Sequence, residues 1–198
     1  MARVFTIVML LLYASSNAQN VADLESFEKA MKPGTVLTYD VTSGGKTYQM
    51  TVTIKKWGDD LSFDWRTNES SLKNGSINVT AAAYNKADAL FSVFNAGNAT
   101  LDKETALCIS KKTYSDVLTN AQASVKMAGQ TDTVTVMNNT ITELNFMLND
   151  NFVSIPMWDL EGGSEIKYTL SVLESQKFPL IVKLNMGWSM LLTSIKTQ

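Results

Sequence analysis

The sequence contains no histidine and a single cysteine, Cys108. Without imidazole, the chain cannot use Ser-His-Asp or Cys-His nucleophile activation, histidine acid–base catalysis, or any metal site that needs this ligand. A lone cysteine cannot form an internal disulfide, so packing must hold the fold together, and we expect Cys108 to be a buried thiol in the apolar segment 106–109. The common hydrolases are therefore not expected, and no metal or cofactor is predicted.

The chain also lacks an excess of positive charge and, after its first residues, a long apolar run. Seventeen Lys and Arg face nineteen Asp and Glu, giving a net charge of −2, and the two signs are interleaved. No basic face is available to neutralise phosphates, so nucleic acid is not an expected partner. The apolar segment 178–184 is short and contains Pro179 and Lys183, whereas a spanning helix needs roughly 18 apolar residues. We therefore predict no membrane span in the mature chain.

The first eighteen residues have the pattern of a removable signal peptide. One positive charge, Arg3, precedes an apolar stretch over residues 4–13, and small residues at Ser16 and Ala18 occupy the positions that a signal peptidase requires. The apolar stretch is of the usual length for a signal peptide and too short to span a bilayer. We expect cleavage after Ala18 and export to the periplasm or the exterior, with residues 19–198 forming a single β-rich domain.

Hydrophobic periodicity predicts a mainly β fold. Alternating segments rich in β-branched and aromatic residues predict strands, and Gly44-Gly45 predicts a hairpin turn between the first two. Apolar residues at helical spacing predict short helices over 20–32 and 85–94 and one or two helical turns near 114–118. The expected strands cover 35–41, 46–56, 61–65, 76–82, 105–110, a hairpin within 122–136, 144–148, 153–158, 165–173, 180–184 and 188–195.

These elements predict a large antiparallel curved sheet with two or three short helices. A sheet of this size must cover its apolar face, so we expect it to curl into a half-barrel or to fold into a sandwich. The sequence pattern leaves these two architectures open.

Several aromatic and methionine residues are candidates for lining an apolar ligand cavity, because these side chains suit adaptable apolar binding. Packing of a large sheet uses the same residue types, and the pattern favours core positions for most of them. The candidate ligand-binding residues are Trp65, Trp158, Trp188, Met147 and Met157.

Carboxylates provide the one enzymatic alternative. Two carboxyl groups held about 5 to 9 Å apart can hydrolyse a glycosidic bond, and the pairs Asp159 with Glu161 and Asp59 with Asp60 are close in the sequence. Both pairs lie in turn-like sequence, where Asp is favoured for backbone reasons. No catalytic residue is assigned from these pairs.

Five Asn-x-Ser/Thr triplets occur in the chain. In a eukaryotic secreted protein they would be candidates for glycosylation, whereas in a bacterium they have no such meaning, and the general character of the sequence favours a bacterial source. The asparagines are Asn68, Asn74, Asn78, Asn98 and Asn138.

The strand pattern of residues 35–54, the segment 178–183 and the pair Gly187-Trp188 together resemble those of uncharacterised exported β-rich proteins of Bacteroidota. The resemblance spans most of the mature chain and implies a β-rich fold and a place in the cell envelope. A more distant similarity is to the curved, unclosed β-barrels of periplasmic lipoprotein carriers. Neither group supplies a functional residue for this chain.

The sequence therefore predicts an exported, non-catalytic binding or structural module of the cell envelope. One alternative is a carrier that holds an apolar, lipid-like molecule on the concave face of the sheet, and another is the carboxylate-dependent glycoside-processing enzyme. A carrier requires an apolar cavity lined by Trp and Met residues, whereas the enzyme requires two convergent carboxyl groups in a cleft.

Overall fold

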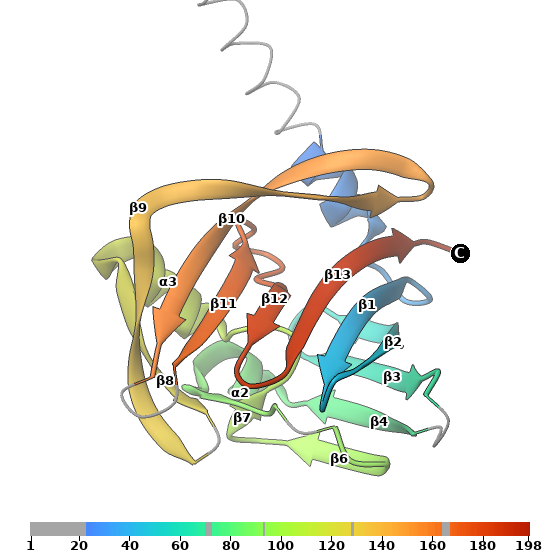
Figure 1. Ribbon diagram of the computed structural model, residues 1–198, viewed down its shortest axis with the longest axis horizontal. Coiled ribbons are helices and arrows are strands. Elements are labelled where there is room, and N and C mark those ends of the chain that lie inside the picture. The colour runs from blue at the N-terminus through green and yellow to red at the C-terminus, as the bar shows by residue number, and fades with distance from the viewer. Residues whose placement is uncertain (1–22, 70–72, 93, 128, 164–166) are drawn as a thin grey trace, which may run out of the picture.

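The computed structural model describes residues 23–69, 73–92, 94–127, 129–163 and 167–198. Within these residues the chain is mainly β, and thirteen strands form one sheet in the order β6-β4-β3-β2-β1-β13-β12-β11-β10-β9-β8-β5-β7. The sheet curls into a half-barrel, part of which closes into a small barrel (Figure 1). The predicted fold class is confirmed. The proposed signal peptide lies outside the described residues.

One wing of the sheet begins with the three strands that the sequence predicts over 35–41, 46–56 and 61–65. Its strands pair antiparallel, except that β4 and β6 are parallel. Side chains alternate along each strand, so one face of the wing is buried and the other is polar. The strands of this wing are β1 (Val36–Ser43), β2 (Lys46–Trp57), β3 (Leu61–Thr67), β4 (Asn74–Val79) and β6 (Gly97–Leu101).

The other half of the sheet closes on itself. The end of β9 pairs in parallel with the end of β13, where Ser194 lies opposite Met147 and Ile195 opposite Leu148. Together with the antiparallel pairs from β9 through to β13, this contact forms a small closed barrel. Its strands are β9 (Gln130–Leu148), β10 (Asn151–Gly162), β11 (Tyr168–Leu173), β12 (Ile181–Asn185) and β13 (Ser189–Lys196).

A sharp bend in β9 makes this closure possible. The register on β10 jumps from Ile141 opposite Trp158 to Val136 opposite Leu160, and Asn138, inside the jump, has a φ of 55°. Such a bulge bends and twists a strand. Figure 1 shows β9 running along one side of the molecule and then crossing above β10 to reach β13. Periodicity alone predicts separate strands here, because it does not show that one strand continues through a bulge.

Three helices and several buried loops accompany the sheet in the described parts of the chain. A helix over residues 23–30 confirms the first predicted helix, and α3 (Lys111–Asn120) extends the helical turns expected near 114–118. The helix predicted over 85–94 is wrong: α2 (Ala81–Lys86) begins earlier, where the Thr80 hydroxyl accepts a hydrogen bond from the backbone of Ala83. The remaining short strands are β5 (Ala89–Leu90), β7 (Glu104–Thr105) and β8 (Gln122–Met127).

Tertiary pairing explains that error. Residues 89–90 form parallel bridges to both β7 and β8, and these bridges compete with a helical conformation. The strand predicted over 105–110 is likewise wrong for most of its length, because only an isolated bridge from Cys108 to Leu180 continues beyond β7. Cys108 is fully buried, as expected from its neighbours.

One end of the half-barrel is closed by aromatic packing. Phe178 makes edge-on contacts with both Phe27 and Trp57. These three rings and the ring of Tyr84 form a cluster, and all four are nearly or fully buried. The Trp57 indole donates a hydrogen bond to the Tyr84 hydroxyl, which donates in turn to the backbone carbonyl of Lys177. Strand β2, helix α2, the 23–30 helix and the loop before β12 are therefore joined at this closed end.

No helix in the described part of the chain is long and apolar enough to cross a membrane. The outer face of the first wing is polar, and the asparagines of all five Asn-x-Ser/Thr triplets are exposed.

Candidate binding site

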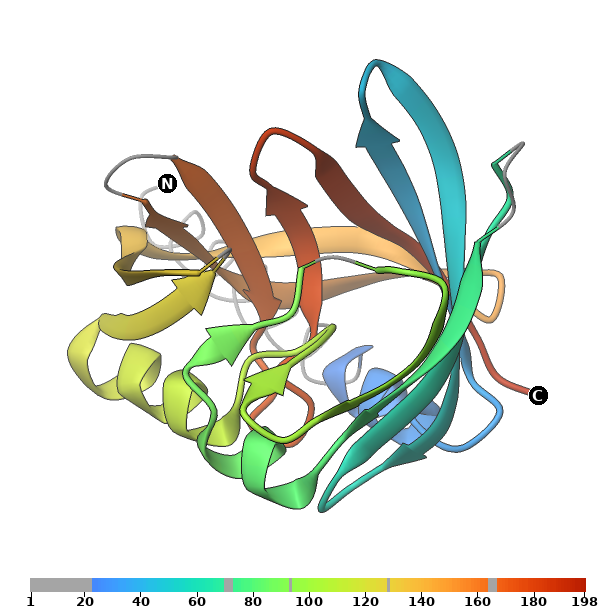
Figure 2. The ribbon, with the colours of Figure 1, turned by 90° about the horizontal axis from the view of Figure 1, so that it is seen from below.

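The end of the half-barrel opposite the aromatic cluster holds a cavity of about 290 Å³. The turns of the β1–β2 and β12–β13 hairpins lie on this same side of the molecule (Figure 2). We call this cavity the rim pocket. Its lining residues are Val41, Ser43, Tyr48, Met50, Trp65, Thr67, Glu69, Lys73, Ser92, Phe94 and Trp188.

The sheet wall of the rim pocket follows directly from strand alternation. Val41 lies opposite Tyr48, Met50 opposite Thr67 and Val52 opposite Trp65 in the antiparallel ladders. Residues two apart on a strand share a face, and these positions share the buried face of β1, β2 and β3. The wall is therefore aromatic and apolar, because the side chains that face the core in the middle of each strand continue as apolar residues to the strand ends.

The facing wall comes from two distant parts of the chain. Phe94 belongs to the connection between β5 and β6, which crosses the open side of the half-barrel (Figure 2). Its ring packs edge-on against Trp65 at 5.4 Å between centroids and against Phe91 at 6.1 Å. Trp188 is in the turn between β12 and β13 and is half-buried. Segments far apart in sequence thus supply the aromatic rings.

Backbone contacts hold the polar edge of the rim pocket in place. The backbone N–H of Thr67 donates to the carbonyl of Lys73, and the N–H of Lys73 donates to the Thr67 hydroxyl. Asn68 and Gln49 exchange two further bonds, of 3.0 and 2.7 Å, between the ends of β3 and β2. Glu69 and Lys73 are therefore attached to an anchored part of the rim.

Two charged side chains line the rim pocket. The Lys73 ammonium lies 3.7 Å from a Glu69 carboxylate oxygen, and the Thr67 hydroxyl donates to the same oxygen at 3.4 Å. Burial, together with the negative charge of Glu69, raises the pKa of the Tyr48 hydroxyl above its usual value. The Tyr48 hydroxyl therefore stays protonated and neutral around neutral pH.

The inner end of the rim pocket is closed by core side chains. Below Met50 and Trp65, the concave face is filled by Leu37, Tyr39 and Val52, all fully buried. A water molecule takes about 30 Å³ of liquid volume, so a cavity of about 290 Å³ has room for a small molecule. A long acyl chain would have to displace core side chains in the described conformation.

The structure brings two of the residues suggested by the sequence into one cavity. Trp65 and Trp188 both line the rim pocket. Trp158 packs against the core from β10, Met157 is buried on the same strand, and Met147 is half-buried on β9. These three residues do not line the rim pocket.

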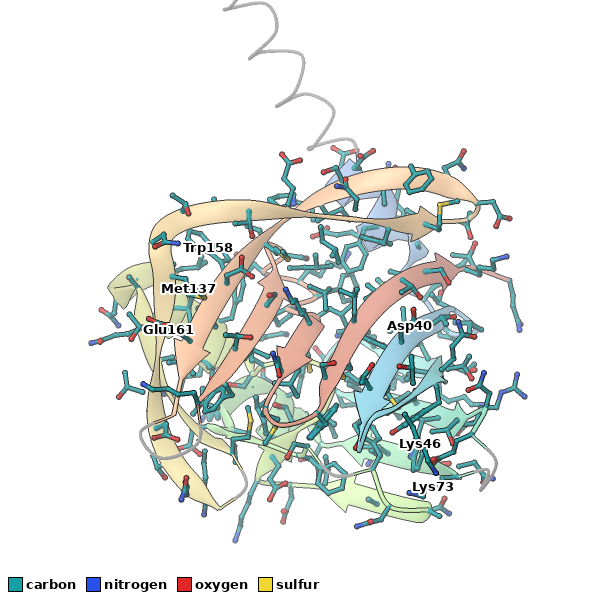
Figure 3. All side chains as sticks on the ribbon, in the orientation of Figure 1. Asp40, Lys46, Lys73, Met137, Trp158 and Glu161 are labelled. Carbon is teal, nitrogen blue, oxygen red and sulfur yellow. The ribbon has the colours of Figure 1, made fainter. Side chains whose placement is uncertain are left out.

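The four carboxylates suggested for glycoside chemistry lie in other surroundings. Asp159 accepts hydrogen bonds from the hydroxyls of Thr142 and Ser171, and Asp60 pairs with Lys56 at 2.9 Å. Asp59 is exposed in the turn before β3. Figure 3 shows Glu161 beside the first half of β9, where it lines a groove of about 680 Å³ together with Asp132.

Sequence reasoning missed the residues Tyr48, Phe94, Glu69 and Lys73. Tyr48 had a signal, since it is an aromatic residue near the predicted Gly44-Gly45 turn, whereas Phe94 was expected at the end of a helix. The pairing of Glu69 with Lys73 depends on the loop conformation at the end of β3, and the sequence has no signal for it. Among the described residues, no group of three or more Cys, Asp or Glu side chains is arranged to hold a metal ion.

Comparisons with known proteins do not indicate a function for this chain. No protein-family model matches the chain, and neither a search of curated proteins nor one of solved structures gives a match.

Proposed function

We propose that this chain is a non-catalytic binding protein that holds a small amphipathic ligand in the rim pocket. The observation that carries the proposal is the convergence of Trp65, Phe94 and Trp188 with one carboxylate–ammonium pair around a cavity of about 290 Å³. Ligand pockets typically combine an aromatic and apolar lining with a few placed polar groups. The apolar part of the ligand would contact the rings, and its polar part would face Glu69 and Lys73.

Several features support a small ligand in place of a lipid chain. The rim pocket closes on side chains that are fully buried, including Leu37 and Val52, and the aromatic cluster occupies the opposite end of the half-barrel. We further propose that the protein is exported and works in the cell envelope. The signal-like pattern of residues 1–18 supports this part of the proposal.

Native mass spectrometry of the protein purified from its own host tests the proposal. We expect a co-purifying small molecule on the unmodified protein and its loss from Trp188→Ala. Trp188 is a suitable target because it is half-buried in a turn, so its truncation removes a pocket wall without opening the core.

Phe152→Ala is the matched control. Phe152 is an aromatic residue on β10 that is 80% exposed and does not line the rim pocket. Loss of the bound molecule from Phe152→Ala but not from Trp188→Ala would place the ligand elsewhere. A protein that carries no molecule and takes up no small aromatic probe would contradict the proposed function.

A further inference from the structure

The two charges of the rim pocket are not equivalent. The Glu69 side chain is 23% exposed and accepts a hydrogen bond from Thr67, whereas the Lys73 side chain is 54% exposed. The separation of 3.7 Å between their charged atoms exceeds the usual length of a charge-assisted hydrogen bond. Glu69 is thus the more buried charge, and Lys73 is a long, exposed side chain that covers it.

An ion pair of this kind is readily exchanged. Exposed Lys–Glu pairs contribute little, because water screens them and the long side chains lose entropy when they are held. Another cation that reaches Glu69 needs only to displace the Lys73 ammonium. An anion bound at Lys73 would meet the more buried carboxylate at short range and would be repelled.

The aromatic lining also favours a positively charged ligand. Ring faces are electron-rich, and ammonium groups bind over Trp, Tyr and Phe rings, most strongly where water is excluded. Trp65, which is only 2% exposed, and Phe94 and Trp188, which are half-buried, provide such rings on two walls of the cavity. The protonated Tyr48 hydroxyl adds no negative charge of its own, so Glu69 is the anionic group of the pocket lining.

We infer that the ligand of the rim pocket carries a positively charged ammonium group, which replaces the Lys73 ammonium at Glu69 while the apolar part of the ligand contacts Trp65 and Trp188. This inference rests on the proposed function. In the ligand-free protein, the Lys73 ammonium occupies the position beside Glu69 that the ligand's ammonium group would take.

Three probes of similar size test the charge. Benzyltrimethylammonium, benzyl alcohol and phenylacetate share an aromatic ring and differ in charge, and their binding can be followed by calorimetry. On the unmodified protein we expect benzyltrimethylammonium to bind about tenfold more tightly than benzyl alcohol, as cation–π and carboxylate contacts are added. Phenylacetate should bind most weakly.

Two variants should change the affinity for the cationic probe in opposite directions. Glu69→Gln should remove the preference for the cationic probe, whereas Lys73→Met should strengthen binding of that probe several-fold because it removes the competing ammonium. Lys46→Met is the control, since Lys46 is a lysine at the β1–β2 turn that does not line the rim pocket (Figure 3). It should leave the order of the three affinities unchanged.

The outcomes separate this inference from the proposed function. Tightest binding of phenylacetate, with loss in Lys73→Met, would show an anionic ligand and overturn the inference alone. Equal affinities for the three probes would also overturn it, while leaving a pocket that selects by shape. Failure of all three probes to bind would overturn both proposals.

Discussion

The indole Nε1 of Trp57 donates a hydrogen bond of 2.8 Å to the hydroxyl of Tyr84 at the closed end of the half-barrel. The indole Nε1 of Trp65, near the rim pocket, is buried over Gly75 and has no partner among the described residues. A buried polar group without a partner costs about 1–3 kcal/mol, and natural proteins seldom keep one without a reason. The closed end therefore has the features of a stabilising core, whereas the rim retains a donor that packing leaves unsatisfied.

Trp57→Phe should destabilise the protein by about 1 kcal/mol, because the phenyl ring keeps most of the packing against Phe178 but no longer donates to Tyr84. Tyr84→Phe should cost more, about 1–3 kcal/mol, since it leaves both the Trp57 N–H and the Lys177 carbonyl without their partner. Urea denaturation measures both free energies of unfolding. The double variant should be less destabilised than the sum of the two single variants, and strict additivity would show that the two groups act independently.

Gly75→Ala should destabilise the β4–β6 edge by about 1–3 kcal/mol, the usual range for overpacking. A Cβ atom at this position would lie 2.0 Å from the carbonyl oxygen of Gly97 and 2.9 Å from the Trp65 Nε1, and the backbone of the paired strand cannot move away without breaking the ladder. Thermal unfolding measures the effect. Gly58→Ala is the control, because a Cβ there meets no atom within 4 Å; an equal loss of stability in both variants would contradict the steric explanation.

The overall architecture was predictable because alternation is a local property. The register of β1, β2 and β3 follows the alternating pattern of residues 35–67, and the Gly44-Gly45 turn fixes the first hairpin. Closure of the barrel was not predictable, because it depends on the bulge near Asn138 and on a parallel contact between β9 and β13, which are remote in sequence. The helix predicted over 85–94 was wrong because pairing with other strands, which periodicity does not show, determines the conformation of residues 89–90.

Stability should fall as the pH rises above about 8. Burial raises the pKa of the Cys108 thiol and of the Tyr39, Tyr84 and Tyr114 hydroxyls, and it raises that of Tyr168 to about 12. In the unfolded chain these groups ionise near their ordinary values, about 8.5 for cysteine and about 10 for tyrosine. The unfolded state then binds fewer protons than the folded state, so the free energy of unfolding decreases with pH.

Urea titrations at pH 8, 9.5 and 10.5 check this expectation. The stability provided by these groups is fully present below pH 8 and is lost progressively above it. Cys108→Ala should flatten the decrease between pH 8 and 9.5 and leave the later decrease, which tyrosine ionisation causes, in place. A free energy of unfolding that stays constant up to pH 10.5 would contradict the account.

The candidate site was only partly accessible to sequence reasoning. Aromatic composition pointed to Trp65 and Trp188, which line the rim pocket, but gave equal weight to Trp158, which packs against the core. Composition does not distinguish a ring that lines a cavity from one that packs against the core. The Glu69–Lys73 pair depends on loop geometry, for which periodicity has no signal.

The proposed export predicts a defined N-terminus. We expect the protein recovered from its own host to begin at Gln19, after removal of residues 1–18. N-terminal sequencing or intact mass measures this directly. Ala18→Asp, which places a charge at the position that must be small, should leave the precursor uncleaved; recovery of the unmodified full-length chain from the cytoplasm would contradict the proposal.

The rim pocket itself is tested most directly by the indole N–H signals of the four tryptophans in ¹H–¹⁵N spectra, assigned with single Trp→Phe variants. Titration with benzyl alcohol, a neutral probe, makes the result independent of the charge inference. The account predicts saturable shifts of the Trp65 and Trp188 signals and unchanged signals from Trp57 and Trp158. Unchanged Trp65 and Trp188 signals, or equal shifts of all four, would contradict it.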